Sequence, residues 1–487
     1  MNTVAFRLKL LSILGVLLFG ACSHFDELNV DPNRMNIASP GTFINPVLYN
    51  VAFHNWGRAN SFTNDLMQVT SSSATSGSIE HYVYSDGLGD GTWNSYYGNL
   101  MNILEMERLA IERGDRNYQA IAITLKSWMY HILVDCFGNI PMSEALRADD
   151  EIFRPKFDNQ QEVYLALIND LDNANSLFDV QTGLIYNKEP ELLFGARNAV
   201  DPIAINKWRK FCNSVRLRIL LRALDTDINA AAEIREMFEN PDQYPLISSN
   251  EEAASLVISG VAPQLGPYTR LTDFYIYGRE IADFFVSSLN TWNDPRCEVF
   301  CYQQVDDGNG NLIYRGRESG LNFEPDYETS GINRNIPVTP LRVALFTYAE
   351  IEFIKAELAL KNIVPSLNSA EAYNKGVQAA IEQWGKVMPA GYLETPGVMF
   401  DGTFEQLMLQ KYYALTYCDY QQWFEYNRTG LPALPRGPGV SAGSEIAHRF
   451  KYPAVIQRMN ADSYQAAVNA MGGDEFDITL FWHKENN

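Results

Sequence analysis

The chain has few basic residues and few cysteines for its length. Its 38 lysines and arginines stand against 59 aspartates and glutamates in 487 residues, which gives a formal net charge of -21 at pH 7. A surface of this sign repels phosphate groups and anionic lipid, so nucleic acid is not expected as a partner. Six cysteines without a repeated spacing do not have the pattern of a disulfide framework.

Metal-ligand patterns are also missing from the sequence. None of the six histidines pairs with another at four-residue spacing, and no histidine lies near a cysteine at metal-ligand spacing. The sequence therefore predicts no metal site and no cofactor. Paired carboxylates for glycosidase chemistry can be chosen anywhere among 59 acids, so their presence carries no information.

The N-terminal 22 residues have the pattern of an export signal. Two basic residues precede an apolar run over residues 10–19, which is too short to cross a bilayer as a helix. The small residues Gly20 and Ala21 then lead to Cys22 and resemble a bacterial lipobox, although Phe19 stands where leucine is preferred. We expect cleavage before Cys22 and lipid attachment to it, with an ordinary secretory peptide as the alternative.

Most of the remaining chain has the periodicity of amphipathic helices in serial pairs. Apolar residues recur at helical spacing from Ile121 to Ile132 before Gly138, and again after Asp201-Pro202. The pairs predict a solenoid-like scaffold, although no clean repeat of about 34 residues is present. Tryptophans inside these helices, namely Trp128, Trp208 and Trp384, are expected in the core. Further helices are predicted over residues 160–178, 346–360, 370–384, 404–420 and 463–471.

Lysines and arginines are concentrated in one predicted helix, over residues 207–222. The same helix carries an apolar stripe between its charges, and the total charge of the chain is strongly negative. We therefore expect these basic side chains to be solvated or ion-paired rather than to bind nucleic acid.

Three stretches break the helical pattern: residues 70–91, 260–339 and 431–453. The middle one is the longest, and long irregular segments on a rigid scaffold commonly carry binding residues. Within it, residues 301–305 and 311–315 flank Asp306-Asp307-Gly308-Asn309-Gly310. This pattern predicts a β-hairpin.

The turn of that hairpin also resembles a calcium-binding loop. Asp307, Asn309, Asn311 and Glu318 fall at positions 1, 3, 5 and 12, where such a loop needs oxygen ligands. The sharp turn of the loop requires glycine at position 6, and Leu312 stands there instead. A plain hairpin turn is therefore the favoured interpretation.

The segment Gly439-Val440-Ser441-Ala442-Gly443 satisfies the G-x-S-x-G pattern of serine hydrolases. That elbow needs a strand directly before the serine, and Pro435 and Pro438 are incompatible with a central strand. We interpret the segment as a surface loop, and we predict no catalytic residue in the chain.

Aromatic residues are abundant: 26 tyrosines, 26 phenylalanines and 8 tryptophans make up 12% of the chain. Flat rings stack on sugar faces or peptide side chains, while Asn, Asp and Arg hold the polar groups around them. Aromatic residues in or beside the irregular stretches are therefore candidates for ligand binding, and packing is the alternative at each position. The candidates are Trp56, Tyr82, Tyr84, Trp93, Tyr96, Tyr268 and Tyr277.

A set of motifs runs in order along nearly the whole chain. Residues 135–146 read D-C-F-G-N-I-P-M-S-E-A-L, which looks like a D-x-F-G-x-x-P-x-S-E-A stretch of known proteins. Together the motifs resemble the SusD/RagB family of nutrient-binding outer-membrane lipoproteins, in its SusD-like branch. Asn427 departs from the family, which usually has arginine there. The other matching segments are residues 28–33, 93–97, 208–221, 294–296, 348–357, 410–423, 427–432, 452–453, 460, 473–474 and 481–482.

The resemblance implies an all-α fold of tetratricopeptide-like helix pairs with long inserted loops and a few short strands. It implies a lipid-anchored protein on the outer face of a Gram-negative outer membrane. Such proteins act as the lid of a SusC-like TonB-dependent barrel and pass it captured oligosaccharide, or peptide in RagB-like cases. They are not enzymes, and their ligand-binding residues vary too much to be carried over to this chain.

For the domain organisation we expect a signal peptide over residues 1–21, a lipid-anchored linker over residues 22–40 and one helical domain over residues 41–487. Two other functions stay open on the residues alone. One is a surface glycoside hydrolase with a helical fold, which needs two carboxylates about 5–10 Å apart in a cleft. The other is a structural or adhesive surface lipoprotein.

Overall fold

From Pro40 onward the chain consists mainly of helices joined by long loops, which together form one unit. The computed structural model describes residues 38–275 and 278–484, so Cys22 and Tyr277 lie outside the described residues. The α-helices are α3 (Gly41–Arg58), α4 (Asn64–Leu66), α5 (Asp90–Arg113), α6 (Arg116–Phe137), α7 (Gln160–Leu177), α8 (Pro202–Arg222), α9 (Ala230–Glu239), α10 (Thr272–Tyr275), α11 (Asp283–Thr291), α12 (Cys297–Phe300), α13 (Tyr348–Leu360), α14 (Ser369–Glu382), α15 (Phe404–Ala414), α16 (Gln421–Thr429), α17 (Ala454–Met459) and α18 (Ala461–Met471).

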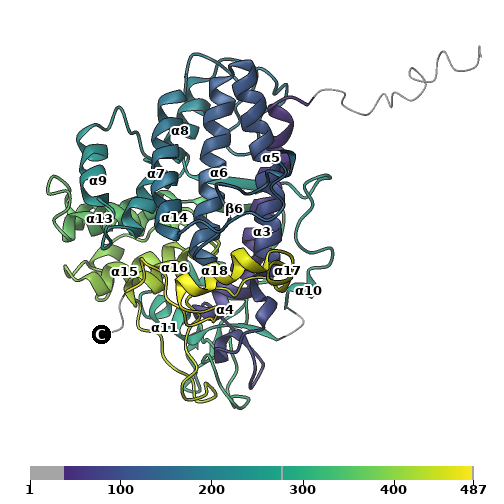
Figure 1. The fold of residues 1–487 in the computed structure, drawn as a ribbon. Helices are drawn as coiled ribbons and strands as arrows, with labels where there is room; N and C mark the ends of the chain where they lie inside the picture. The colour runs from purple at the N-terminus through teal and green to yellow at the C-terminus, as the bar shows by residue number, and fades with distance from the viewer. Residues whose placement is uncertain (1–37, 276–277, 485–487) are drawn as a thin grey trace, which may run out of the picture. The chain divides into compact units, whose positions relative to one another are not determined.

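Helices α5, α6, α7 and α8 stand side by side, each packed on the next in sequence (Figure 1). The predicted stripe from Ile121 to Ile132 is buried along α6 because this helix has neighbours on both sides. Gly138 ends α6 with a φ angle of 82°, a conformation that favours glycine. Helix α8 begins where Asp201-Pro202 predicts, and the Asp201 carboxylate accepts hydrogen bonds from the amides of Ile203 and Ala204.

A second group of helices is formed by α13, α14 and α15, each of which packs on the other two. Some predicted boundaries here are wrong. Phe346, predicted to start a helix, lies in a strand, and α15 ends at Ala414 rather than near residue 420. Tyr417 and Asp419 have positive φ angles, which no continuing helix permits, and α16 starts only at Gln421. The helix-pair architecture itself, an all-α fold with long loops, is as expected.

Six short strands in the described part of the chain form three separate antiparallel pairs. The β4–β5 pair is the predicted hairpin, and the Asp307 carboxylate accepts hydrogen bonds from the amides of Asn309 and Asn311 inside its turn. In the β2–β6 pair, Ser255 lies opposite Ala344. The strands are β1 (Thr70–Ser72), β2 (Ala254–Ile258), β3 (Arg279–Ile281), β4 (Val305–Asp306), β5 (Leu312–Ile313) and β6 (Leu341–Phe346), and β1 pairs with β3.

Four of the six basic residues of α8 are ion-paired, as one of the two expectations had it, whereas Lys207 and Arg209 donate to uncharged oxygen atoms. Arg218 is buried and forms a two-point pair with Glu350 of α13, at 2.7 Å and 2.6 Å. Arg222 reaches Asp135 of α6 in the interior. Both residues of the Arg218–Glu350 pair lie in motif segments of the sequence, 208–221 and 348–357, so these motifs join two distant helices. The other pairs of this helix are Lys210–Glu252, Arg216–Asp172 and Arg216–Glu233.

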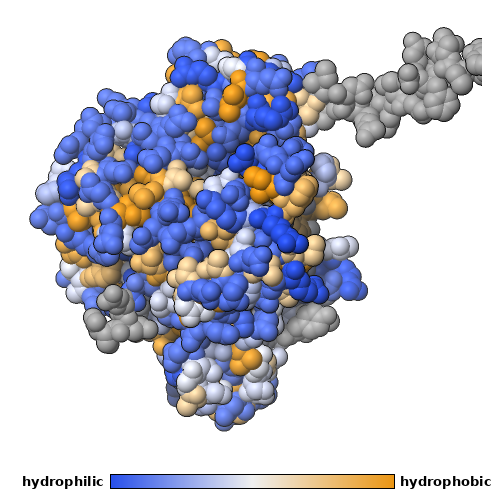
Figure 2. Space-filling model, in the orientation of Figure 1, coloured by the Kyte–Doolittle hydropathy of each residue, from blue (hydrophilic) through white to orange (hydrophobic). Residues whose placement is uncertain are grey.

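Cys297 and Cys301 are two buried thiols, and burial raises the pKa of both. On the face drawn in Figure 2, hydrophilic residues predominate and apolar residues appear in small groups.

Helix α6 is long and apolar enough to span a membrane by composition, but 94% of its apolar window is buried inside the fold. Its hydrophobicity is thus that of a core helix.

Candidate ligand-binding site

Loop segments far apart in the sequence meet around the buried carboxylate of Glu80. Its oxygens accept hydrogen bonds from the Ser71 hydroxyl at 2.6 Å, from the Ser72 amide at 3.0 Å and from the Ser72 hydroxyl at 2.7 Å. The amide of Gly320 donates to the same carboxylate at 3.3 Å. One buried acid thus ties the first irregular stretch to the middle one, because a buried carboxylate needs several donors.

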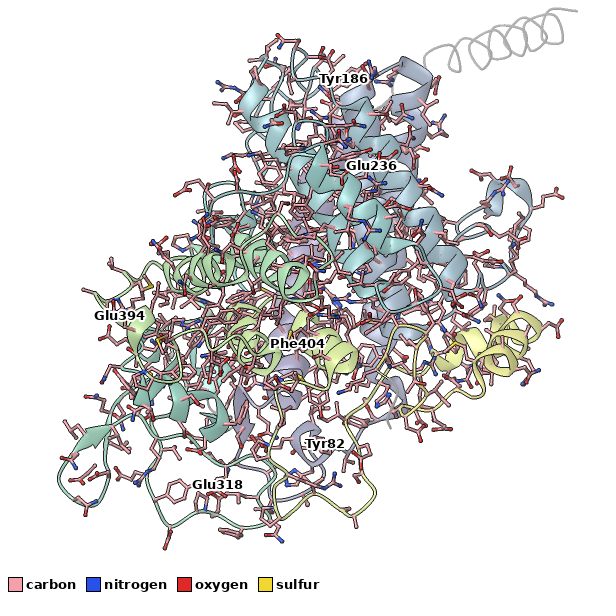
Figure 3. The ribbon with its side chains drawn as sticks, turned by 90° about the vertical axis from the view of Figure 1, so that its left-hand side faces the viewer. Tyr82, Tyr186, Glu236, Glu318, Glu394 and Phe404 are labelled. Carbon is pink, nitrogen blue, oxygen red and sulfur yellow. The ribbon has the colours of Figure 1, made fainter. Side chains whose placement is uncertain are left out.

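A third segment completes this surface. The amide of Gly439 donates to the carbonyl of Gly320 at 2.7 Å, and the side chain of Gln68 donates to the carbonyl of Pro435 at 2.7 Å. We call the surface formed by residues 70–89, 317–323 and 435–447 the loop platform. Figure 3 shows Tyr82 and Glu318, which belong to it, at the same end of the molecule, away from Tyr186 and Glu236.

Close backbone approach explains the glycine-rich sequence of the third segment. A Cβ atom on Gly437 would lie 2.1 Å from the carbonyl oxygen of Ser319, so no side chain fits at this position. Residues 434–443 form turns without a strand, and Arg436 donates to the carbonyl of Ser441. The prediction that the G-x-S-x-G segment is a surface loop is therefore confirmed.

A cavity of about 310 Å³ opens in the loop platform. Its size is at the lower end of the range for ligand pockets, and its wall combines hydroxyl groups with apolar side chains. Asp65, at its edge, is ion-paired with Arg279 of β3 at 2.8 Å. The lining residues are Asp65, Ser72, Gly77, Ser78, Ile79, Glu80, Val83, Ser85 and Leu88.

Two of the predicted aromatic residues, Tyr82 and Tyr84, lie in the loop platform. Tyr82 has a positive φ angle of 56°, uncommon for a residue other than glycine, and the guanidinium of Arg436 lies 5.7 Å from its ring centre. The hydroxyl of Tyr84 donates to the carbonyl of Glu445 and accepts from the amide of Ala447. Burial raises the pKa of both tyrosines, so their hydroxyls stay protonated near neutral pH.

Two further candidates, Trp56 and Tyr268, form an aromatic cluster. Their ring centres are 6.1 Å apart in a T-shaped arrangement, and Trp56 also stacks on Tyr417 at 5.9 Å. Asn60 joins the cluster by donating to the hydroxyl of Tyr268 and accepting from that of Tyr417. Trp56 lies on α3 and is only 3% exposed, so Tyr268, which is half-buried, presents the accessible surface of this pair.

The last two described candidates, Trp93 and Tyr96, lie on α5 and face the interior. Trp93 is 5% exposed and packs against the rings of Phe137 and Tyr452. Tyr96 has no exposed surface, and its hydroxyl donates to Asn55 of α3 at 2.7 Å. The structure gives both residues a packing role, since no ligand reaches them without a rearrangement of α5.

Several residues that organise the site carry no signal in the sequence. Glu80 and Gly437 matter through partners more than 100 residues away along the chain, which no local pattern reveals. Trp384, expected in the core, is half-buried because α14 ends at Glu382, two residues before it. Within residues 38–275 and 278–484, no group of three or more His, Cys, Asp or Glu side chains is placed to hold a metal ion.

The fold thus combines a helix-pair scaffold, ion-paired motif segments and a platform of converging loops. Residues 32–453 match the model of the SusD-like family described as starch-binding and associating with the outer membrane. The chain therefore belongs to this SusD-like family, as the sequence motifs indicate. No curated protein sequence matched the chain.

Solved structures share the fold at low sequence identity. A SusD homologue from Bacteroides fragilis is 22% identical with a TM-score of 0.73, and the match covers 92% of this chain and 100% of that one. A SusD-like protein from Bacteroides thetaiotaomicron is 20% identical with a TM-score of 0.74, over 91% and 99% of the chains. A chitin-binding SusD homologue from Flavobacterium johnsoniae is 18% identical with a TM-score of 0.72, over 92% and 99%.

Proposed function

We propose that this protein is a lipid-anchored, non-enzymatic glycan receptor on the outer face of the outer membrane, and that it acts as the lid of a SusC-like TonB-dependent barrel. The observation that carries the proposal is the family match over residues 32–453, because that family is described as starch-binding and outer-membrane associated. The fold shared with a chitin-binding SusD homologue supports oligosaccharide, rather than peptide, as the ligand.

The proposed organisation follows the sequence. Residues 1–21 direct export, Cys22 carries the lipid, residues 22–40 link the anchor to the protein, and residues 41–487 form the binding domain. On this domain the loop platform and Tyr268 present aromatic and hydroxyl groups to the ligand. Such surfaces suit sugars, because flat rings cover the apolar face of a sugar while hydroxyls and amides bind its rim.

The lid function is tested by affinity purification of the tagged full-length protein from gently solubilised outer membranes, followed by mass identification of the co-purifying proteins. We expect a TonB-dependent barrel in near-equal amount. Recovery of the protein without any barrel would contradict the lid function. Glycan binding is measured separately by isothermal titration calorimetry on the purified mature protein with a panel of oligosaccharides, and hydrolysis of those oligosaccharides would contradict the non-enzymatic assignment.

A further inference from the structure

A second cavity, of about 970 Å³, lies over the β2–β6 pair and shares no lining residue with the cavity of the loop platform. Its volume is near the upper end of the range for ligand sites, which is enough for several sugar rings. Segments from both helix groups and from the middle irregular stretch surround it. They are residues 191–195, 250–251, 253, 255, 333, 335–336, 338, 340–342, 344, 382–385 and 416–418, together with Lys207, Val299 and Thr347.

Small side chains on the outer face of the two strands create this space. Along β2 and β6 the inward positions, such as Leu256 and Val343, are buried, while Ser255 and Ala344 point to the other face and lie opposite each other. Both line the cavity. A larger residue at either position would occupy the volume, so the cavity depends on the size of these two residues.

An aromatic side chain lines the cavity just beyond the end of α14. Trp384 is half-buried, and its ring makes T-shaped contacts with Phe300 at 4.9 Å and with Tyr417 at 6.3 Å. These neighbours fix the position of the indole. A rigid indole at the wall of a cavity is a platform on which a sugar face can stack with little loss of side-chain entropy.

Polar groups without partners accompany this indole. Asn250 Oδ1, Gln383 Oε1 and Trp384 Nε1 are buried and have no hydrogen-bond partner among the described residues. Leaving such atoms unsatisfied is unfavourable, so a ligand or solvent that pairs with them is favoured. Two acceptors and one donor match hydroxyl groups, which both donate and accept.

The charges around the cavity do not select an ionic ligand. Arg342 is exposed and forms no ion pair within the described part of the chain, and Lys207 donates to the carbonyl of Glu251. The carboxylates of Glu251 and Glu382 also line the cavity, so positive and negative groups are both present. A guanidinium without a carboxylate partner is available to donate to neutral oxygen atoms.

We propose that this cavity is a binding site for a neutral oligosaccharide, separate from the loop platform. In this site Trp384 stacks on one sugar ring, while Arg342 and the amides of Asn250 and Gln383 bind its hydroxyl groups. The inference rests on the proposed glycan binding and adds the place and the ligand class. Two separate sites on one receptor hold a long glycan at two points, which raises its residence time without any stronger single contact.

The test uses the mature protein labelled with 5-fluorotryptophan, whose Trp384 resonance is assigned with Trp384→Phe. Maltohexaose, cellohexaose, xylohexaose and N-acetyl-chitohexaose are titrated by ¹⁹F NMR, with calorimetry on the same samples. We expect at least one of them to shift the Trp384 resonance. The variant Ala344→Phe, which fills the cavity and removes no hydrogen bond, should weaken that binding by about tenfold or more. Ala466→Phe is the matched control, because it makes the same exchange at an exposed position on α18, outside the cavity lining.

A Trp384 resonance that none of the four sugars moves would overturn the inference, as would a shift caused by a hexapeptide mixture and by no sugar. Equal loss of binding in Ala344→Phe and Ala466→Phe would also overturn it. Calorimetric binding with an unmoved Trp384 resonance rejects the cavity but keeps the proposed glycan receptor. Absence of heat with every sugar counts against the glycan receptor itself.

Discussion

Arg428 on α16 forms a two-point ion pair with Glu357 on α13, with distances of 2.7 Å and 2.8 Å between their nitrogen and oxygen atoms. Burial alone would raise the pKa of Glu357, but the neighbouring Arg428 guanidinium holds it below its ordinary value. Both groups are therefore charged inside the protein. Arg428 also pairs with Glu425 at 2.7 Å, so Glu357 is one of two carboxylates that compensate its buried charge.

Glu357→Ala should lower the free energy of unfolding by about 3–5 kcal/mol, since it leaves the Arg428 guanidinium buried without this partner. Urea denaturation followed by circular dichroism measures the change. The matched control is Glu371→Ala, on the neighbouring helix α14, which removes an exposed pair with Lys375 and should leave stability nearly unchanged. Equal effects of the two changes would show that the buried pair is not needed.

Gly138→Ala should destabilise the protein more than Gly114→Ala. Both glycines have positive φ angles, 82° and 71°, and an alanine in the left-handed region costs about 1–2 kcal/mol. At Gly114 nothing lies within 4 Å of an added Cβ, whereas at Gly138 it would meet the Met471 methyl carbon at 2.4 Å. Thermal melts of the two variants distinguish backbone strain, which both share, from the steric clash with Met471, which only Gly138→Ala has. A smaller loss of stability for Gly138→Ala would contradict the role given to this contact.

Stability should fall as the pH drops from 6.5 towards 4, in part through His54. Burial, helped by Arg58, lowers the pKa of His54 from 6.5 to about 4. Between these values the unfolded chain binds a proton that the folded His54 does not, so acid favours unfolding. His54→Gln should reduce the loss of stability between pH 7 and pH 5 in urea titrations. An unchanged slope in the variant would remove His54 from the explanation.

Glu80→Ala should loosen the loop platform and weaken glycan binding there while the helices stay folded. The change removes the carboxylate that accepts hydrogen bonds from Ser71, Ser72 and Gly320. Hydrogen exchange over residues 317–323 should rise, and the affinity of any glycan that binds the platform should fall several-fold. The control is Glu328→Ala, which removes an exposed acid from the middle irregular stretch, residues 260–339. Increased exchange without loss of affinity would place the ligand elsewhere.

Cys22→Ala should release the protein from the membrane, because the lipid anchor proposed for this residue is then lost. Membrane fractionation and immunoblotting measure the distribution. Cys212→Ala, which changes a buried thiol of α8, should remain in the outer-membrane fraction. A Cys22→Ala protein that still sediments with the outer membrane would contradict lipid anchoring as the main tether.

Helices whose ends have local causes were predictable from the sequence. Asp201-Pro202 sets the start of α8 through its side-chain cap, and Gly138 sets the end of α6 through its φ angle. The end of α15 was not predictable, since an apolar period continues to Tyr420 while the backbone leaves the helix at Leu415. There, the positive φ of Tyr417 follows from packing on Trp56, a residue far away in the sequence.

The candidate site was predictable only in outline. Aromatic residues near irregular stretches were identified, but Tyr96 is covered by α3, and the ring of Tyr82 lies against Arg436, far away in the sequence. The exposure of a side chain depends on which segments pack over it, and these segments come from elsewhere in the chain. For the same reason the exposure of Trp384 was not predictable, since its helical surroundings suggested a position in the core.

In the export proposed for this chain, the segment that becomes α6 has to cross the inner membrane before it folds. Residues 116–137 are apolar enough to stop in the inner membrane as the chain is secreted. Lys126, His131 and Asp135 interrupt this segment, and a lysine at the centre of a lipid-embedded helix costs about 2.5–3.5 kcal/mol. These side chains find charged partners once the protein has folded. Before folding, the cost of placing these side chains in lipid disfavours arrest of the segment in the membrane during the proposed export.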